Sequence, residues 1–541
     1  MSATTIELLE RRICMDGNVQ AAIVGGDLEV RGDGGDNNVV IQRINGKIRV
    51  TGLEGTRVGG QSFREFVTTF DDLEIYMRQG GEDTVLLHGG MKINGDLAAQ
   101  MGNGNLAVEG TAAALEIGGN LFARGGDGCD IEVRNEVIVR GRADIATGGE
   151  ASLAAAEATV PNFAGARFSN PRDIDNPYFP QVVGTRYTYE ETSIDDETGE
   201  ESTETIVVEV TNQTKTILGV GTRVVRDRAF DEDGLIIEDT SDWFAQDDNG
   251  NVWYFGEQST DFEYDDEGNL IDTSTETSWI AGVNGARPGI VMLARPNVGY
   301  RYYQEMAPGD ALDYGQVLAT NQTVRVAGRT FNNVLRTQDK NLRSPTETEH
   351  KLYAPGLGLI QEFGFDPISG EVEATLRLRS VTRNGSPVTQ VVSPTGFTGT
   401  NPGGRVTGPV RVFGETLIRA GDAVVVQGGR FADELEIEGE AEVLVLLSQL
   451  EDLTISAEDN VALRNVTASE EVQIEGDVDV FIFASRFNDR VAITLGDDDN
   501  ELAVRGSTFE ELFADGGGGE NEFDDRGGND FDDLDLRRFE A

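Results

Sequence analysis

The last third of the chain alternates apolar and polar residues over short segments, each ending in an acidic or glycine-containing turn. The first apolar residues of one class of segment are Leu435, Leu453, Val472, Val491 and Leu512, so the steps between them are 18, 19, 19 and 21 residues. This period is too short for helical repeats. Units of about 20 residues cannot bury a core alone and must stack on their neighbours. The pattern therefore indicates a solenoid.

Apolar residues at every second position place one face of each strand inward and the other outward. The outward positions are mostly Glu, Asp, Arg and Thr. Coils of parallel strands joined by Gly, Asp and Asn corners satisfy this pattern, because each coil pairs its backbone with the coils above and below. Residues 409–541 are therefore predicted to form a parallel β-helix with an acidic, Gly/Asp-rich end.

The N-terminal part of the chain repeats these features less regularly. Residues 17–160 contain strand and turn units at uneven spacing, which predicts a first β-helix segment. Residues 1–16 are charged and apolar at near-helical spacing, which predicts a cap over the first coil. Residues 384–408 are rich in Pro, Gly, Ser and Thr and are interpreted as a linker. The sequence leaves open whether the two coil segments dock into one solenoid.

The middle of the chain, residues 170–383, holds all three tryptophans and ten of the 11 tyrosines. Long alternating runs, such as residues 205–210 and 323–326, are joined by acidic turns that contain glycine. Such turns are hairpin signals between antiparallel strands. The chain is thus predicted to be all-β, with two parallel β-helix segments that flank an antiparallel β barrel or sandwich.

Charge limits the classes of partner. The chain has 44 Lys and Arg against 96 Asp and Glu, a net charge of -52, so it should repel nucleic acid. An acidic surface attracts cations instead, and stability should depend on salt or divalent ions. No apolar run approaches the roughly 20 residues of a membrane span. Residues 1–25 lack the basic start and apolar core of a standard signal peptide.

The opening of the chain reads Leu8-Leu9-Glu10-Arg11-Arg12, and residues 17–21 and 25–30 continue with Gly-Asn-Val-Gln-Ala and Gly-Gly-Asp-Leu-Glu-Val. This opening resembles the N-terminus of secreted β-helical proteins of planctomycete bacteria, which carry a Leu-Glu-x-Arg export-associated element. The basic and apolar run that usually precedes the element is not found here. The resemblance implies a secreted β-helical repeat protein.

The middle region contains Asn176-Pro177-Tyr178-Phe179-Pro180 and Tyr353-Ala354-Pro355-Gly356-Leu357-Gly358, with residues 242–247 and 250–256 between them. It resembles a family of secreted bacterial β domains that has no assigned activity. This second resemblance implies an extracellular or cell-surface setting and names no catalytic residue.

Calcium is the best candidate for a bound ion. Residues 516–524 approximate the calcium-binding nonapeptide Gly-Gly-x-Gly-x-Asp-x-U-x, with Asn521 at the ligand position, Asp524 at the end, and Asp530 nine residues beyond Asn521. Residues 32–40 are a second degenerate copy, which contains Asp36 and Asn37. Oxygen ligands on stacked turns suit Ca²⁺. The favoured alternative is a set of solvated corners, in which Gly and Asp only make the turn.

The aromatic residues Trp243, Trp253, Tyr254 and Trp279 suggest a platform for sugars, because flat rings stack on the apolar faces of sugars. Large aromatic residues in a single β domain are more often its core, and the core is the favoured interpretation.

Catalytic motifs are sparse. His88 and His350 are the only histidines, and neither has the spacing of a nucleophile site or a metal site. The preferred function is a non-catalytic secreted or cell-surface structural or binding protein with weak calcium binding on acidic turns, whose partners are divalent cations and a surface polysaccharide or protein. The alternative is a carbohydrate-binding or carbohydrate-active β-helix protein of the polysaccharide lyase or hydrolase type, which would use carboxylates.

Overall fold

The computed structural model describes residues 17–53, 55–66, 69–77, 83–110, 113–194, 201–265, 268–275, 278–307, 311–342, 348–365, 372–388 and 399–540. The chain divides into two compact units, residues 1–155 with 409–541, and residues 156–408. Strands dominate the described ranges, whose one helical element is a short 3-10 turn, η1 (Phe163–Gly165). The predicted all-β class is confirmed, and so is the β-solenoid. The predicted cap at residues 1–16 lies outside the described residues.

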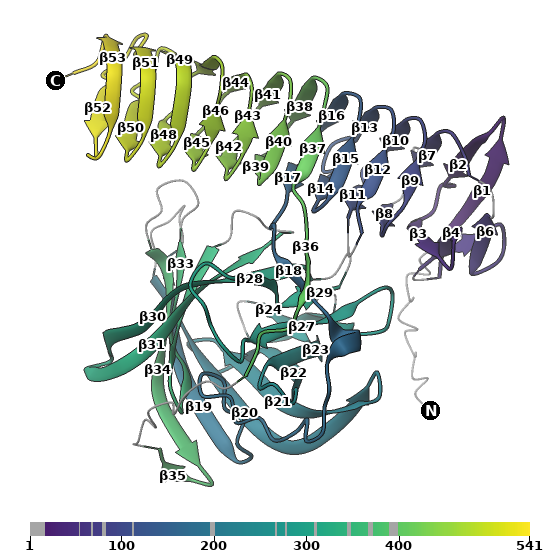
Figure 1. Cartoon of the computed structure of the whole chain (residues 1–541), viewed down its shortest axis with the longest axis vertical. Coiled ribbons are helices and arrows are strands. Elements are labelled where there is room, and N and C mark those ends of the chain that lie inside the picture. Colours follow the sequence, from purple (N-terminus) through teal and green to yellow (C-terminus); the bar gives the residue numbers. More distant parts are fainter. Residues whose placement is uncertain are drawn as a thin grey trace, which may run out of the picture. The chain divides into compact units, whose positions relative to one another are not determined.

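The first unit is the solenoid, in which parallel strands stack coil upon coil (Figure 1). One ladder runs through β2 (Asp27–Arg31), β7 (Leu73–Met77), β10 (Leu97–Met101), β13 (Leu121–Arg124), β16 (Ala143–Thr147), β38 (Thr416–Ala420), β41 (Leu435–Gly439), β44 (Leu453–Ala457), β47 (Val472–Gly476), β49 (Arg486–Leu495), β51 (Thr508–Asp515) and β53 (Asp530–Arg537).

A second ladder forms another wall of each coil. It contains β3 (Asn38–Ile44), β8 (Thr84–His88), β11 (Asn105–Glu109), β14 (Ile131–Arg134), β17 (Ala151–Ala154), β39 (Val424–Gln427), β42 (Val443–Leu446), β45 (Val461–Arg464), β48 (Val480–Phe483), β50 (Glu501–Arg505) and β52 (Glu522–Asp525).

Short strands make a third ladder, in which each strand pairs in parallel with the corresponding strand of the next coil. They are β9 (Lys92–Ile93), β12 (Leu115–Ile117), β15 (Val137–Val139), β37 (Val410–Val412), β40 (Gly429–Phe431), β43 (Gln449–Leu450) and β46 (Thr467–Ala468).

The 18- to 21-residue period in the sequence corresponds to one coil. Leu435, Leu453, Val472, Val491 and Leu512 are register partners on successive coils, and all are fully buried. Each coil thus places an apolar side chain directly over that of the previous coil, which is how units without cores of their own bury apolar surface.

The outward faces of the two main ladders differ. The first ladder alternates buried and partly exposed residues, as the sequence predicted. In several coils of the second ladder the outward residue is apolar as well: Val425, Leu444 and Ala462 are 0% exposed. Other coils keep a partly exposed acidic residue at the same register position, Glu132 in β14 and Asp524 in β52. The prediction of a polar outward face was therefore wrong for the coils that contain Val425, Leu444 and Ala462.

The first coil departs from the parallel pattern. The strand β4 (Lys47–Gly52) pairs antiparallel with β3 through a turn in which Asn45 and Gly46 have φ of 51° and 81°. Positive φ at both central residues is what an Asn-Gly hairpin turn requires. The strand β6 (Phe63–Phe66) adds to β4, and β1 (Asn18–Val24) pairs antiparallel with β2. This end of the solenoid is therefore built from hairpins.

The solenoid continues across the point where the second unit leaves it. Although residues 156–408 intervene, β15 pairs in parallel with β37, β16 with β38, and β17 with β39. Their registers join Val139 to Val412, Ile145 to Ile418, and Leu153 to Val426. The two coil segments therefore form one solenoid, and residues 156–408 are inserted at a corner between consecutive coils.

The second unit is a closed barrel of mainly antiparallel strands, in which Thr159 pairs in parallel with Tyr302. Its strands are β18 (Thr159–Pro161), β19 (Thr185–Ile194), β20 (Glu201–Ile217), β21 (Val220–Phe230), β22 (Ile236–Gln246), β23 (Val252–Gln258), β24 (Asp261–Tyr264), β25 (Leu270–Ser274), β26 (Trp279–Ile280), β27 (Arg287–Met292), β28 (Arg301–Tyr303), β29 (Glu305–Met306), β30 (Asp313–Val326), β31 (Arg329–Asn341), β32 (Thr348–Ala354), β33 (Gly358–Phe365), β34 (Val372–Arg383), β35 (Ser386–Pro387) and β36 (Gly404–Val406).

The first and last strands of the barrel unit hold its two ends together. Thr159 of β18 pairs antiparallel with Val406 of β36, and the amide of Thr407 donates to the carbonyl of Ala158 at 3.0 Å. Part of the predicted linker, residues 404–406, is thus a strand of the barrel, while residues 389–398 lie outside the described ranges. Within the described residues, no helix has the length and hydropathy needed to cross a bilayer.

Candidate functional site

The predicted calcium ligands of the last coils take part in coil-to-coil contacts. Asn521 is 1% exposed, and its Oδ1 accepts a hydrogen bond from the amide of Asn500 at 3.1 Å. The carboxylate of Asp524 pairs with Nε of Arg526 at 2.6 Å. Asp530 begins β53, in the first ladder, whereas Asp524 belongs to β52 in the second. The structure therefore does not gather these three side chains around one point.

The predicted ligands near the N-terminus lie on a buried corner. Asn37 is fully buried, and both its amide and its Nδ2 donate to Oδ1 of Asp83 at 2.9 Å. The carbonyl of Asp36 accepts from the amide of Gly17 at 3.2 Å. Burial raises the pKa of Asp83, which the sequence did not single out. In the part of the chain that the structure describes, no three His, Cys, Asp or Glu side chains are grouped as metal ligands, and calcium binding stays a prediction.

The acidic corners instead form ladders of side-chain to backbone hydrogen bonds. The Oδ1 atoms of Asp27, Asp72, Asp96 and Asn120 accept, in turn, from the amides of Asp72, Asp96, Asn120 and Arg142 at 3.1, 2.8, 2.7 and 3.0 Å. Each acceptor satisfies a backbone donor that would lack a partner at a corner. The signal was present in the sequence: Asp72, Asp96 and Asn120 are 24 residues apart (96 − 72 and 120 − 96).

The four predicted aromatic platform residues, Trp243, Trp253, Tyr254 and Trp279, are all buried. The indole of Trp253 donates to Oδ2 of Asp247 at 3.0 Å, and the indole of Trp279 donates to Oε2 of Glu305 at 3.1 Å. Trp243 lies under the ammonium group of Lys215. A sugar platform needs an exposed ring face, so this burial favours the core interpretation.

Tyr254 belongs to an acidic cluster that a β-bulge assembles. Asp242 of β22 pairs with Glu257 of β23, and Phe244 pairs with Tyr254. Between these two pairs β22 has one residue and β23 has two, so β23 carries one extra residue. Gly256 takes up the bulge with φ of 118°, where a side chain would meet the carbonyl of Trp279. The bulge puts Tyr254 and Glu257 on the same face although they are three residues apart.

The Tyr254 hydroxyl lies 2.7 Å from Oδ1 of Asp242 and 3.0 Å from Oε2 of Glu257. Burial raises the pKa of Asp242 well above its ordinary value, with a further contribution from the charge of Glu257. Burial also raises the pKa of Glu257 to about 7. The Tyr254 hydroxyl has one proton, so it can donate to only one of the two carboxyl groups. The second contact is a hydrogen bond if the other carboxyl is protonated and donates to the hydroxyl oxygen.

A second charged cluster surrounds Lys351. Its ammonium nitrogen lies 2.9 Å from Glu349, 3.3 Å from Asp339 and 3.5 Å from Glu362. Burial opposes the charge of Lys351, but the three carboxylates hold its pKa well above the ordinary value. Burial raises the pKa of Glu362 to about 8, whereas the charge of Lys351 lowers that of Glu349. Lys351 is therefore charged and paired with Glu349, and Glu362 takes up a proton most readily.

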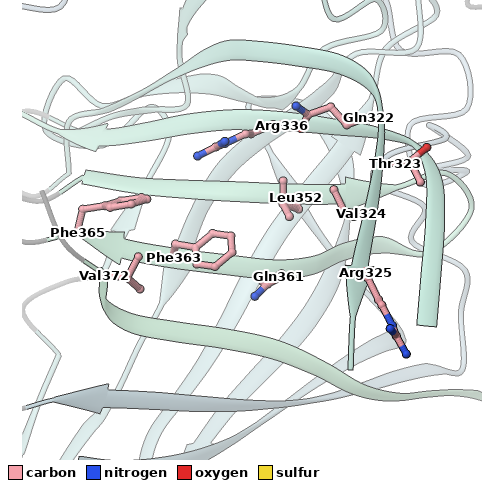
Figure 2. Close-up of a pocket in the computed structure, with 10 residues that line it drawn as sticks. All are labelled: Gln322, Thr323, Val324, Arg325, Arg336, Leu352, Gln361, Phe363, Phe365 and Val372. Atoms are coloured by element: carbon pink, nitrogen blue, oxygen red, sulfur yellow. The ribbon is translucent and has the colours of Figure 1, made fainter. Parts of the chain in front are cut away.

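A cavity of about 650 Å³ lies against the opposite face of these strands (Figure 2). Its floor is a cross-strand row in which Arg336 of β31, Leu352 of β32 and Gln361 of β33 are register partners. Residues 322–325 of β30 form one wall. The β30–β31 pairing shifts register three times, between Val317 and Val324, and such irregularities bend a strand.

The second wall of the cavity is apolar and aromatic. It consists of Phe363 and Phe365 of β33 with Val372 of β34. The ring centroids of Phe363 and Phe365 are 6.3 Å apart, and His350 packs edge-on against Phe365 at 4.6 Å. The cavity therefore joins a polar floor to an aromatic wall, which is the usual composition of a small-ligand pocket.

Among the described residues that line the cavity, the charged ones are Arg325 and Arg336, and none is Asp or Glu. Nη2 of Arg336 lies 2.5 Å from Nδ1 of His350, and because a guanidinium can only donate, Nδ1 is the acceptor of a neutral imidazole. Burial first, and the charge of Arg336 second, lower the pKa of His350 to about 4, so the ring stays neutral near pH 7.

The chain has little similarity to known proteins. No protein-family model matches the chain, and no curated protein matches it. Two solved structures are similar: one from Bacteroides fragilis, described as an exported protein with a YmcC-like fold, and one from Parabacteroides distasonis, described as a lipoprotein. They are 13% and 11% identical, cover 38% of this chain and 100% and 99% of their own, and have TM-scores of 0.24 and 0.22. Similarity at this level carries no argument about fold or function.

Proposed function

We propose that the chain is a non-catalytic binding protein of the cell surface or extracellular space, in which the solenoid is a scaffold and the inserted antiparallel barrel contacts the ligand. The observation that carries this proposal is the unbroken register of β15, β16 and β17 with β37, β38 and β39. The scaffold loses no backbone pairing at the insertion. The inserted unit is thus an addition to a complete solenoid, which suits a displayed binding domain.

Features of the barrel support its role as the binding unit. It contains the 650 Å³ cavity, whose size falls within the range of small-ligand pockets, roughly 300–1,000 Å³. The acidic corners of the solenoid, by contrast, use their side-chain oxygens to hold neighbouring coils together. Weak binding of divalent cations on the remaining carboxylates of these corners forms part of the proposal, since a chain of net charge -52 attracts them.

The cation part is tested by the melting temperature of the full chain. Millimolar Ca²⁺ is expected to raise the melting temperature above that in EDTA, because ions that bind the folded state stabilise it and screen its charge. NaCl at the same ionic strength is the control for screening alone. Equal melting curves in Ca²⁺ and NaCl would leave screening as the whole effect and contradict binding of divalent cations.

The binding role is tested with tryptophan fluorescence, because all three tryptophans lie in the barrel. Acidic and neutral polysaccharides are added to the full chain, and a saturable change in emission is expected for a polymer or oligomer that the barrel binds. A panel that leaves the emission unchanged, together with no binding on glycan arrays, would contradict a carbohydrate ligand.

A carbohydrate-active enzyme is the second candidate. The observation that favours it is the pair Asp242 and Glu257, whose raised pKa values and contact with Tyr254 resemble an acid-base arrangement. The two candidates differ in products. Release of new sugar ends from any polysaccharide, lost in Glu257→Gln, would establish the enzyme and overturn the non-catalytic proposal.

A further inference from the structure

The inner face of the barrel carries carboxylates that lie opposite one another. Asp242 of β22 and Glu257 of β23 are register partners, so their side chains project from the same face of the sheet. This face is the inner one, because Val225, the register partner of Asp242 on β21, belongs to one core cluster with Leu335 and Tyr353 of β31 and β32. Like charges at opposed positions destabilise a strand pair, so the fold alone does not account for this arrangement.

A second opposed pair of carboxylates faces the same interior. Glu191 of β19 is the register partner of Glu204 of β20. Burial, and then the charge of Glu204, raise the pKa of Glu191, which also senses the charges of Glu349 and Lys351 on β32. Two strands, β34 and β33, lie between β19 and β32 in the barrel, so these side chains approach one another across its interior. Burial, and then the charge of Glu238, raise the pKa of Glu204.

Lys351 shows how this interior holds an ammonium group. Its nitrogen lies within 3.5 Å of three carboxylates, one each from β31, β32 and β33. A comparable set, here called the Asp242 group, consists of Asp242, Glu257 and Glu305 on β22, β23 and β29, and the charges of the first two raise the pKa of Glu305 further after burial. Among the described residues, none of the three forms an ion pair with a basic side chain. The Asp242 group therefore has the acidic surroundings of an ammonium but no basic side chain of its own.

The interior also contains polar atoms that no protein group satisfies. Thr337, the register partner of Lys351, is 1% exposed, and its hydroxyl has no hydrogen-bond partner. Asp339 is 7% exposed, and its Oδ1 likewise has none. Buried polar atoms are normally satisfied by protein, water or a ligand. The side chains around them keep accessible surface, 23% for Lys351 and 43% for Glu349, so the interior admits small polar molecules.

Aromatic rings beside the Asp242 group favour an organic cation over a metal ion. The Tyr254 hydroxyl contacts Asp242 and Glu257, and its ring meets the ring of Trp279 edge-on at 5.4 Å. Such rings attract organic ammonium groups and pack against methylene chains. In the described part of the chain, no carboxylates are grouped closely enough to be metal ligands, and this includes those around Lys351. Contacts to an ammonium are longer than bonds to Ca²⁺, so these carboxylates suit an ammonium better.

We propose that the barrel interior binds a linear diamine or longer oligoamine, with one ammonium in the Asp242 group, its methylenes along Tyr254 and Trp279, and a further ammonium toward Glu191 and Glu204. Two separate carboxylate pairs call for more than one amine. The inference rests on the proposed function in taking the barrel as the binding unit. It accounts for the opposed carboxylates, because the ligand supplies the positive charge that offsets their repulsion.

Cation binding in this site is linked to proton release. Burial raises the pKa of Glu257 to about 7, so part of the group is protonated at neutral pH, and a bound ammonium favours the ionised form. Alkyl amines stay charged in this range, as lysine does. Affinity should therefore fall by more than about tenfold between pH 8 and pH 5.5. The titratable groups that face Glu257 are Asp227, Glu238, Asp242, Tyr254, Asp261 and Glu305.

Calorimetric titration of the full chain tests the ligand class. The probes are cadaverine, spermidine and 1,5-pentanediol, which replaces both ammonium groups of cadaverine with hydroxyls, in about 0.15 M NaCl to suppress binding to the acidic surface. Cadaverine and spermidine are expected to bind saturably, one per chain, with proton release seen as a dependence of the heat on the buffer. Pentanediol should bind at least about tenfold more weakly. Equal binding of pentanediol, or amine binding without proton release, would overturn the proposal.

Substitutions locate the site. Asp242→Asn and Glu257→Gln each remove a negative charge from the Asp242 group and are expected to weaken cadaverine binding about tenfold or more. Glu263→Gln is the matched control, because it removes the same charge at an exposed position of β24, and should change affinity less than about twofold. Glu257→Gln relieves a buried charge, so its variant is expected to fold and decides the test even if Asp242→Asn does not.

The outcomes separate this proposal from the proposed function. No saturable amine binding, or equal affinity in Glu257→Gln and the parent chain, would overturn the amine site, while polysaccharide binding by the barrel would still support the proposed function. Ca²⁺ that displaces cadaverine one for one at lower concentration would make the interior a metal site and overturn the amine class. New sugar ends released from a polysaccharide would overturn the non-catalytic function, whereas amine binding lost in Glu257→Gln would still support the amine site.

Discussion

At the scale of single residues, the Asp and Asn side chains at the corners have a structural role. Each Asp or Asn of the ladder that includes Asp72, Asp96 and Asn120 accepts the backbone amide of the next coil. Asn120 does with a neutral side chain what Asp72 and Asp96 do with a charged one, so the ladder requires the Oδ1 acceptor and not the charge. Carboxylates at these corners are therefore compatible with cation binding but do not require it.

Substitutions of Asp96 separate these roles. Asp96→Ala should destabilise the chain by about 1–2 kcal/mol, because the amide of Asn120 loses its 2.7 Å acceptor. Asp96→Asn should be nearly neutral, because the acceptor is kept. Chemical denaturation followed by far-ultraviolet circular dichroism measures both. If the two variants were equally destabilised, the negative charge and not the hydrogen bond would be the stabilising feature.

At the scale of elements, regular features were predictable and irregular ones were not. The coil period followed from Leu435, Leu453 and Val472, because a solenoid repeats one contact many times. The cavity depends on register shifts in β30 and on the row of Arg336, Leu352 and Gln361, which are far apart in the sequence. No local pattern encodes these pairings, so Arg325 and Arg336 were not predicted as residues of the cavity.

The contacts of the predicted site residues also depend on residues that are distant in the sequence. Residues 516–524 were recognised as a turn motif, but the partner of Asn521, the amide of Asn500, lies on the preceding coil. The aromatic residues were correctly placed in the β domain, and their burial depends on strand pairing. The bulge at Gly256 could have been suspected from a glycine inside an alternating run, but its consequence, the contact of Tyr254 with Glu257, could not.

The acidic cluster of β22 and β23 should make stability depend on pH. The pKa of Glu257 is raised from an ordinary value of 4.5 to about 7, so the folded state binds more protons than the unfolded state between these values. Stability from this group therefore falls as pH rises from about 4.5 to 7, and the full penalty remains above pH 7. Glu257→Gln mimics the protonated form and removes the penalty.

The expected result is that Glu257→Gln is more stable than the parent chain at pH 8, by on the order of 1 kcal/mol, and about equal to it near pH 4.5. Tryptophan fluorescence during chemical denaturation measures this difference in stability, because the tryptophans lie in the same unit as Glu257. Glu263→Gln, at an exposed position of β24, is the control and should show no such dependence. A gain of the same size at both pH values would contradict the assignment.

At the scale of the whole molecule, the central feature is that the solenoid is interrupted in sequence and continuous in space. The sequence left this open, because spacing alone does not say which strand lies next to which. The parallel pairing of β15 with β37 and of β16 with β38 shows that the coils before and after the insertion are neighbours. The proposed function depends on this continuity, since a scaffold can present an inserted barrel only if its own coils stay joined.

Cross-linking across the insertion tests this claim most directly. Ile138 and Arg411 are register partners 273 residues apart (411 − 138), on strands that lie about 5 Å apart, which is within reach of a disulfide. The chain has two cysteines, Cys14 and Cys129, and Cys129 is free and buried. In a Cys14→Ser background, the pair Ile138→Cys and Arg411→Cys is predicted to form an intramolecular disulfide under mild oxidation. The control pair, Ile138→Cys and Arg430→Cys, is one coil further away, at about 10 Å, and should not. Failure of the first pair to cross-link, or equal cross-linking of both, would contradict a continuous solenoid.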